Sequence, residues 1–497
     1  MLSQRRAMPG VRPSRRHSCR PMAWLSNQST DVTYAVVGGK ADPQLLTSNP
    51  TMAQTIAALT ASRPRDNQEL FGQMLDGISL EDKRQKLKKM SAGPFHFYRG
   101  SAKFFYRDMQ QQNVMVNNPF DVAGAKTWLT GDMHMANASF VGSYLYDVYR
   151  LAASVALVAR DESNKTLEAP EDAASKYVLT FARSYLQQIE ALAADANKDS
   201  VNRKPLNKDS AYGLIHDKLL KDPLDSDLGA NDEYVKGDKL DKLRAPKDDP
   251  YSLQSVDKNV EDAVRDAVDA YARTTVKWAD PDDRKGSKYF EVLDVMQRFD
   301  QGTGSLGTTR FYVLVAGSKK KPPVLLDVKQ QGPPAWYDYV SDGEKAAAYG
   351  DLPYVDERDA ARVVRAYKKM VSYGPDPHFG VLTLSGLGKP WDGFYSVRER
   401  SRWKKSLKLV WELPKPGKEE KHDPLNDEDL ELLAEQYGTL LANAHDRASS
   451  QSYLGEDGTA DNFAKSLRDG LQGKEEAFIK SVVSVGCAYA RQVQDSG

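Results

Sequence analysis

The sequence has little of what disulfide frameworks and metal centres are built from. Only two of its 497 residues are cysteines, Cys19 and Cys487, and they stand near opposite ends of the chain. The seven histidines are scattered, without the spacing of metal ligands. We therefore expect neither a disulfide framework nor a cysteine-based zinc site, and no structural metal is predicted.

Long apolar runs and an excess of charge are also missing. No apolar run approaches the ~18 residues that a membrane helix needs, so no membrane partner is expected. The 69 basic and 69 acidic residues cancel, and nothing attracts the whole chain to nucleic acid. With 40% hydrophobic and 28% charged residues, the composition predicts a soluble globular protein of two or three domains.

The first 50 residues are predicted to be a basic leader. Up to residue 30 the acidic residues are absent and arginines recur; Asp31 is the first acid. An acid-free leader with Arg and Ser is typical of an organelle transit peptide. A disordered basic tail or a misassigned start is the alternative, because prolines at 9, 13 and 21 weaken an amphipathic helix. The expected location is cytoplasmic or organellar.

The most informative stretch follows the apolar pair at 128–129. Asp132 and Asn137 stand five residues apart, with His134 between them. In phosphotransferases an aspartate in such a loop accepts the proton of the substrate hydroxyl, and an asparagine five residues later holds Mg²⁺. The spacing predicts Asp132 and His134 as catalytic residues and Asn137 as a metal ligand. A plain turn rich in Gly, Asp and Asn is the alternative.

Aromatic and basic residues alternate between positions 95 and 107. Such interleaving can indicate stacking on nucleic-acid bases. At helical spacing it more often indicates a buried aromatic stripe with arginines at its margin, and we prefer this interpretation. Arg99 remains a candidate partner for a phosphate, because its planar fork suits bidentate contacts.

A second group of candidates lies in a β-rich region. Residues 290–298, 310–316 and 324–328 are predicted strands, and a glycine-rich turn separates the first two. A dinucleotide-binding glycine motif must lead into a helix, whereas this one leads into a strand. In kinases a glycine loop between strands covers the phosphates, and a lysine on the next strand neutralises them. The alternative is a hairpin with a surface lysine. The predicted nucleotide-binding residues are Gly302, Gly304, Ser305, Gly307, Lys329 and Arg99.

The remaining pattern is mostly helical. The helices are predicted at about 144–160, 170–194, 256–275, 356–371, 426–445 and 475–494. Residues 196–250 are rich in Lys, Asp, Gly and Pro and are predicted to be an exposed, partly disordered insertion. The expected organisation is a helical lobe at 51–285, a β-rich lobe at 286–412, and C-terminal helices at 413–497 that pack on the helical lobe. His445, at the predicted end of a helix, is expected to be structural.

Several segments together resemble a known family. The clearest are F-H-F-Y-R-G at 95–100, G-D-M-H-M-A-N at 131–137, R-F-D-Q-G-T-G-S-L-G at 298–307, L-L-D-V-K at 325–329 and L-L-A-N-A-H-D-R at 440–447. In this order they resemble the largely bacterial family called domain of unknown function twenty-two fifty-two, over about residues 60–495. Its G-D-x-H-x-x-N loop is similar to that of aminoglycoside phosphotransferases and related kinases. The resemblance implies an α+β, two-lobed protein-kinase-like fold that uses ATP and Mg²⁺ on a small-molecule substrate.

The chain departs from the kinase pattern in two ways. The glycine loop and its lysine follow the catalytic loop here, so the expected kinase-like fold is circularly permuted. The family also continues from its asparagine into an N-D-F-D-E-like stretch, similar to a second Mg²⁺-binding motif, whereas here Phe140 leads almost directly into Asp147. Asp147 substitutes as a metal ligand, or the site has lost a ligand, or the gene model is incomplete. A phosphotransferase and a catalytically dead kinase-like protein that binds a nucleotide or a partner therefore both remain open.

Overall fold

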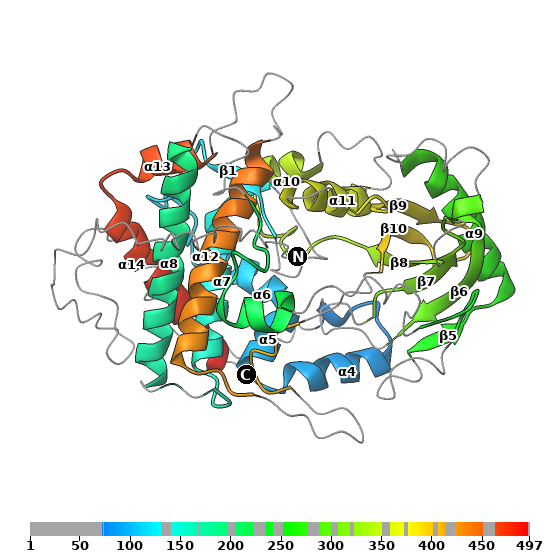
Figure 1. The fold of residues 1–497 in the computed structure, drawn as a ribbon, viewed down its shortest axis with the longest axis horizontal. Coiled ribbons are helices and arrows are strands. Elements are labelled where there is room, and N and C mark those ends of the chain that lie inside the picture. The colour runs from blue at the N-terminus through cyan, green and yellow to red at the C-terminus, as the bar shows by residue number, and fades with distance from the viewer. Residues whose placement is uncertain are drawn as a thin grey trace, which may run out of the picture. The chain divides into compact units, whose positions relative to one another are not determined.

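Helices, a six-stranded antiparallel sheet and two two-stranded sheets make up the described part of the computed structural model, a mixed α+β architecture (Figure 1). The structure describes residues 72, 74–130, 141–164, 166, 169–195, 204–221, 234–241, 252–275, 288–299, 307–318, 323–349, 358–371, 376–400, 406–412, 423–450 and 463–495. The predicted leader at 1–50 lies outside these residues. Among the described helices, none combines the length and the apolar character needed to cross a membrane.

Eight helices from both ends of the chain share one hydrophobic core. They are α4 (Leu80–Met90), α5 (Pro94–Gly100), α6 (Ala102–Gln111), α7 (Leu145–Ala159), α8 (Pro170–Ala194), α12 (Asp427–Ser450), α13 (Phe463–Leu471) and α14 (Glu475–Gln494). The C-terminal helices α12 and α14 pack on α7 and α8. A Cβ atom on Gly438 of α12 would lie only 2.5 Å from the Phe181 carbonyl oxygen of α8, so glycine permits this close helix contact.

The aromatic segment at 95–107 is part of this core. Phe104, Phe105 and Tyr106 are fully buried, which confirms the buried stripe that helical spacing predicts. The guanidinium of the buried Arg150 lies 4.6 Å from the centre of the Tyr98 ring, and the Tyr98 hydroxyl donates to the Arg150 carbonyl oxygen at 2.7 Å. These contacts fix α5 against α7, and base stacking is therefore not available to these rings.

The sheet has six strands in the order β5-β6-β7-β8-β10-β9, and every neighbouring pair is antiparallel. The strands are β5 (Leu253–Ser255), β6 (Val292–Arg298), β7 (Arg310–Val315), β8 (Val324–Gln331), β9 (Gly380–Leu384) and β10 (Gly393–Glu399). The three strands predicted between 290 and 328 are all present. The short strand β5 joins the sheet although it precedes residue 286.

Alternation along β7 explains why both faces of the sheet are covered. Phe311 and Val313 face a cluster that includes α9 (Lys258–Thr275), which lies against the sheet in Figure 1. Tyr312 and Leu314 point to the opposite face. There the hairpin β3 (Val235–Lys236) and β4 (Lys239–Leu240) covers them. The apolar run of β7 is therefore buried on both sides.

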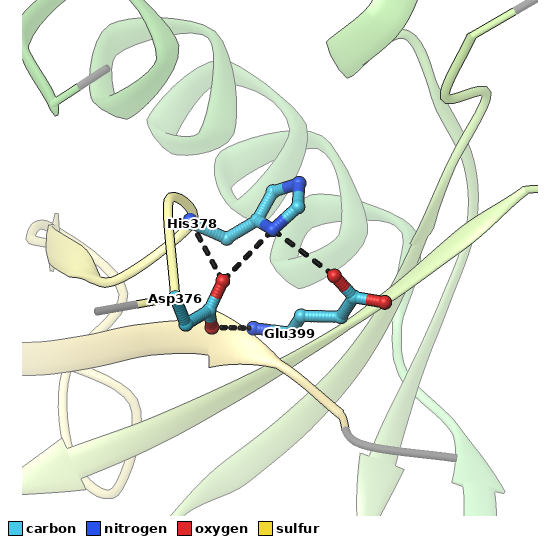
Figure 2. Close-up of side chains that lie close together, drawn as sticks. All are labelled: Asp376, His378 and Glu399. Atoms are coloured by element: carbon cyan, nitrogen blue, oxygen red, sulfur yellow. Dashed lines mark hydrogen bonds and ion pairs between the residues drawn. The ribbon is translucent and has the colours of Figure 1, made fainter. Parts of the chain in front are cut away.

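The turn before β9 is joined to the end of β10 by Asp376, His378 and Glu399 (Figure 2). Asp376 accepts hydrogen bonds from the backbone N–H of His378 at 2.9 Å and from that of Glu399 at 2.6 Å. Burial opposes a charge on the His378 ring, but hydrogen bonds to Asp376 and Glu399 raise its pKa to about 9. The group links two neighbouring strands at one edge of the sheet.

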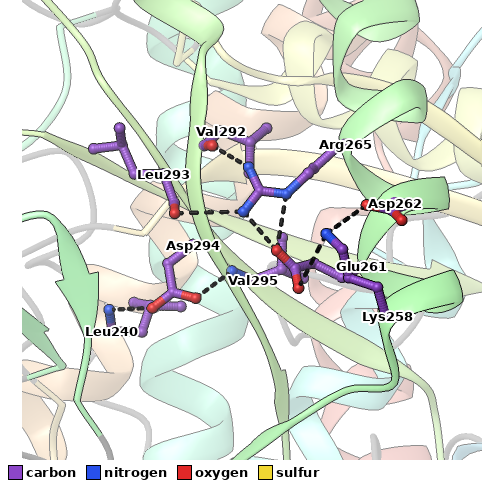
Figure 3. A network of polar contacts seen from close by, with 9 residues as sticks. All are labelled: Leu240, Lys258, Glu261, Asp262, Arg265, Val292, Leu293, Asp294 and Val295. Carbon is purple, nitrogen blue, oxygen red and sulfur yellow. Dashed lines mark hydrogen bonds and ion pairs between the residues drawn. The ribbon is translucent and has the colours of Figure 1, made fainter.

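A second polar network attaches α9 and the β3–β4 hairpin to β6 (Figure 3). Arg265 of α9 pairs with Glu261 at 2.6 Å and donates to the backbone carbonyl of Val292. Asp294 accepts a hydrogen bond from the backbone N–H of Leu240 at 2.8 Å. The hairpin belongs to the predicted insertion at 196–250, and in it Tyr234, Val235 and Leu240 are buried against the sheet.

Two helices lie between the strands β8 and β9 in the sequence. These are α10 (Asp342–Tyr349) and α11 (Arg358–Met370). Helix α11 contacts β8, β9, β10 and α12. Arg362 of this helix is thereby positioned where the sheet meets the helices.

A cationic cavity as the candidate functional site

Lys329 lies within the sheet, and not at the end of a strand as predicted. It faces Arg310 of β7 on one side and Ser396 of β10 on the other in the strand register. Strand β8 continues to Gln331 because pairing with β10 continues that far. The Lys329 residue is only 8% exposed, and it is one of the residues that line a cavity.

This cavity has a volume of about 340 Å³ and is strongly cationic. Among the described residues that line it, five carry a basic side chain and one, Asp338, carries an acidic one. The basic residues are Lys86, Arg99, Lys103, Lys329 and Arg362. We call it the cationic cavity. The structure thus brings together Lys329 and Arg99, two residues predicted from distant parts of the sequence.

Three of the basic side chains come from the N-terminal helices. Helix α4, which carries Lys86, begins at a capping residue, Ser79, whose hydroxyl accepts the Asp82 N–H at 3.1 Å. Arg99 lies in the last turn of α5 and 4.0 Å from Glu412, with both side chains nearly half exposed. Such an exposed pair contributes little, so Arg99 can exchange Glu412 for an anionic ligand.

Arg362 is held in place by aromatic rings. It lies on α11 and is 2% exposed. Its guanidinium carbon lies 5.5 Å from the Trp336 ring centre and 5.7 Å from that of Tyr349. Because ring faces carry negative potential, they add to the ion pair that Arg362 forms with Asp359 at 3.8 Å. Arg362 therefore supplies a fixed positive charge to the cationic cavity.

The balance of charge indicates what the cavity binds. Asp338 pairs with Lys103 at 2.9 Å. Arg99 pairs with Glu412 at 4.0 Å and Arg362 with Asp359 at 3.8 Å. Basic side chains still outnumber acidic ones among the described lining residues, which favours a positive local potential. Such a potential attracts a multiply charged anion, and phosphate groups match both lysine and arginine donors.

Gly307 is the described member of the predicted glycine turn; Gly302, Gly304 and Ser305 lie outside the described residues. Its φ of +82° belongs to the left-handed region that favours glycine. A Cβ atom there would come within 2.1 Å of the Ile78 side chain. The turn therefore packs against the segment that leads into α4, and the following residue, Thr308, lines the cationic cavity.

Two short strands bracket the predicted catalytic loop. Strand β1 (Lys126–Trp128) pairs with β2 (Val141–Ser143), and Trp128 is opposite Val141. The two ends of the loop are therefore held side by side. Asp132, His134 and Asn137 lie outside the described residues, and their predicted roles stay predictions.

Asp147 is fully buried near the start of α7. One carboxylate oxygen accepts the Thr130 backbone N–H at 2.6 Å and lies 3.4 Å from Nε2 of His445. The other ring nitrogen of His445 lies 2.9 Å from the Tyr185 hydroxyl. Burial, together with the nearby Asp147 and Asp446, raises the pKa of Tyr185 well above its usual value. These contacts favour a role for Asp147 in positioning the loop, while its role as a metal ligand stays a prediction.

His445 is structural, as expected, but the helix does not end there. Helix α12 continues to Ser450, and His445 is completely buried. Its backbone carbonyl accepts the hydroxyl of Thr127 in β1 at 2.6 Å. His445 therefore supports the two strands that hold the predicted catalytic loop.

A second, larger cavity of about 810 Å³ adjoins the same two strands. Its walls include Trp128 and Val141, together with Tyr146, Tyr339 and Phe463. The segment 332–349 contributes residues to both cavities, with Trp336 in the first and Tyr339 in the second. We call this second space the apolar cavity; its size is that of a small-molecule site.

Sequence reasoning did not identify Lys86, Lys103 or Arg362 as members of a site. Each stands on an amphipathic helix among other charged residues, which on its own is typical of a solvated face. Only the packing of α4, α6 and α11 around the end of β8 brings them together.

One family model matches the chain in two segments, residues 81–141 and 138–496, and carries the description "Uncharacterized protein conserved in bacteria (DUF2252)". No curated protein and no solved structure gives a significant match.

Proposed function

We propose that this chain, which belongs to the DUF2252 family of proteins conserved in bacteria, is a kinase-like phosphotransferase that uses ATP and Mg²⁺ on a small-molecule substrate. The observation that carries the proposal is the cationic cavity, in which Lys329 and Arg99 converge with three further basic side chains. Phosphoryl transfer depends mainly on positioning and on stabilising charge. A fixed group of cations is what that chemistry requires from the protein.

The roles follow from position. Lys329 and Arg362 are buried and would contact the phosphates from the sheet and from α11. Arg99, which is more exposed, would contact them from the opposite wall. Asp132 would accept the proton of the substrate hydroxyl, and Asn137 would hold Mg²⁺; both roles rest on the sequence pattern.

The apolar cavity is the candidate site for the acceptor substrate. It adjoins β1 and β2, the strands on either side of the loop that carries Asp132. The segment 332–349 contributes residues to the walls of both cavities. A donor in one cavity and an acceptor in the other would then border the same segment, as transfer requires the two reacting groups to lie close together.

The packing is also compatible with a circularly permuted kinase-like fold. Lys329 comes from the second half of the chain, whereas Lys86, Arg99 and Lys103 come from the first, and all four line one cavity. Two lobes that meet at a phosphate site depend on such packing rather than on the order of segments in the chain.

A second candidate function is nucleotide binding without transfer. The two segments of the family match meet at residues 138–141, where the resemblance predicts a metal-binding stretch that this chain lacks. Asp147, the one nearby substitute that the sequence suggests, is fully buried and accepts the Thr130 N–H. Both observations favour a chain that binds a nucleotide but holds Mg²⁺ poorly.

Calorimetry on the full chain tests the proposal. If phosphates carry the binding, the affinity should fall in the order ATP, ADP, AMP, and adenosine should bind least, because each phosphate lost removes charge from the cationic cavity. Equal affinities for ATP and adenosine would show that the phosphate groups do not bind in the cationic cavity. Release of ADP in the presence of hydroxylated small molecules then separates the two candidate functions. A catalytically dead kinase-like protein binds ATP but produces no ADP.

A further inference from the structure

Three side chains at the edge of the sheet bring a nitrogen and two carboxylate oxygens close together. Nδ1 of His378 lies 3.0 Å from a carboxylate oxygen of Asp376 and 3.3 Å from one of Glu399. All three ligand atoms lie within 4.8 Å of one another. Figure 2 shows both carboxylates turned toward the same ring nitrogen.

These separations are those of ligands around one small cation. Zn²⁺ binds histidine nitrogen and carboxylate oxygen at about 2.1 Å, so two ligands about 90–110° apart are separated by roughly 2.9–3.4 Å. Both distances from Nδ1 fall within this range. Glu399 is the most exposed of the three, with 38% of its side chain accessible, and it can move the short distance that closes the site.

Hydrogen bonds from neighbouring groups also orient the ligands, as is usual at metal sites. The backbone N–H groups of His378 and Glu399 fix the Asp376 carboxylate. The other ring nitrogen of His378, Nε2, lies 2.9 Å from the Tyr289 hydroxyl, and the two rings stack with centres 5.9 Å apart. The imidazole therefore presents Nδ1 to the carboxylates in a fixed orientation.

We propose that Asp376, His378 and Glu399 form a binding site for a divalent first-row transition metal such as Zn²⁺. One imidazole nitrogen with two carboxylate oxygens suits such an ion, whereas Mg²⁺ and Ca²⁺ favour oxygen ligands alone. The partly exposed carboxylates leave an entry path and a position for water. The bound ion joins the turn before β9 to the end of β10.

This metal site is separate from the proposed nucleotide site. Glu399 is opposite Leu326 in the strand register, while Lys329 is opposite Ser396, three positions along β10. The cationic cavity includes none of the three metal ligands among its described lining residues. The proposal therefore stands without the proposed function.

Titration of the chelator-treated full chain with Zn²⁺ tests it, by calorimetry and by thermal unfolding. We expect about one ion bound per chain and a melting temperature that rises with Zn²⁺, because binding to the folded state alone stabilises it. His378→Gln should abolish both effects. Glu399→Gln, at a more exposed position, should keep the fold and weaken binding about tenfold or more.

His216→Gln is the matched control. His216 lies on the π-helix Ile215–Leu220 and pairs with Asp217 at 2.8 Å, so it offers a histidine beside a carboxylate without a third ligand in the described structure. This variant should bind Zn²⁺ like the wild type, and Mg²⁺ should not compete. The metal site would be refuted if the wild type showed no saturable binding of Zn²⁺, or if His378→Gln and Glu399→Gln bound Zn²⁺ as well as the wild type. The three side chains would then be a cluster held by hydrogen bonds alone.

Discussion

The carboxylate of Asp147 accepts a hydrogen bond of 2.6 Å from the backbone N–H of Thr130, although 17 positions separate the two residues in the chain. Thr130 is the last described residue before the predicted catalytic loop, and Asp147 is completely buried. The contact therefore fixes where that loop leaves β1. A buried charge that accepts a backbone hydrogen bond can position a loop without taking part in its chemistry.

Asp147→Asn tests this positioning role. The amide keeps the shape of the side chain but loses the negative charge that accepts the Thr130 N–H and faces His445. We expect a loss of about 1.5–3 kcal/mol in the free energy of unfolding, measured with urea. Asp342→Asn, at a side chain that is 99% exposed, is the control and should change little. Unchanged stability of Asp147→Asn together with a large loss of Mg²⁺ affinity would instead indicate a metal ligand.

Lys329→Met tests the cationic cavity. Methionine has a similar length and is apolar, so it should occupy the packed position in β8 without disturbing the sheet. The variant should lose the stabilisation by ATP, which is about 2.7 kcal/mol for a ligand at a hundred times its Kd. Thermal unfolding with and without ATP measures this.

Lys288→Met is the matched control for Lys329→Met. Lys288 is 80% exposed on a short 3-10 helix, Lys288–Phe290, and its variant should respond to ATP like the wild type. If ATP stabilises Lys329→Met as strongly as it stabilises Lys288→Met, the lysine does not contact the phosphates.

Gly307→Ala tests the contact between the glycine turn and the segment before α4. Alanine at a φ of +82° is strained, and its methyl group would overlap Ile78. We expect a destabilisation of more than about 1 kcal/mol in urea unfolding. The double variant Gly307→Ala with Ile78→Ala should recover the steric part of this loss, because the overlapping side chain has been removed. Additive losses in the double variant would show that the two residues are not in contact.

The lowered pKa of Asp327 predicts how the stability of the protein depends on pH in acid. Burial alone would raise its pKa, but Arg310 and Arg398 lower it to about 2. Since the folded-state pKa is lower than the usual 3.8, the contribution to stability is present above about pH 4 and is lost as the pH falls toward 2. From the size of this shift it amounts to about 2 kcal/mol.

The variant Asp327→Asn separates this contribution from those of other carboxylates. At neutral pH it should be destabilised by about 3–5 kcal/mol, because Arg310 keeps a buried charge without its partner. The difference from the wild type should shrink between about pH 4 and pH 2, as followed by urea midpoints. A difference that stays constant over this range would contradict the ion-pair origin.

Local patterns in the sequence predicted the six longest helices and three strands of the described fold. Helix α8 has the predicted bounds, and α7, β6 and β7 lie within a few residues of theirs. Periodicity sufficed because each of these segments buries one face or both faces along its whole length. The preference for a buried aromatic stripe at 95–107 rested on the same signal, and burial of Phe104 and Tyr106 confirms it. The motifs also indicated the family, which the family model shows.

Tertiary structure alone decided which charged residues share a site. The sequence marked Arg99 and Lys329 as candidates, but Lys86, Lys103 and Arg362 look like members of solvated helix faces until α4, α6 and α11 pack around β8. The tertiary structure also placed Glu399 beside His378, because β9 and β10 are neighbours in the sheet. Helical and strand periods report which side of an element is apolar, whereas the partner of a polar side chain depends on contacts between segments distant in the chain.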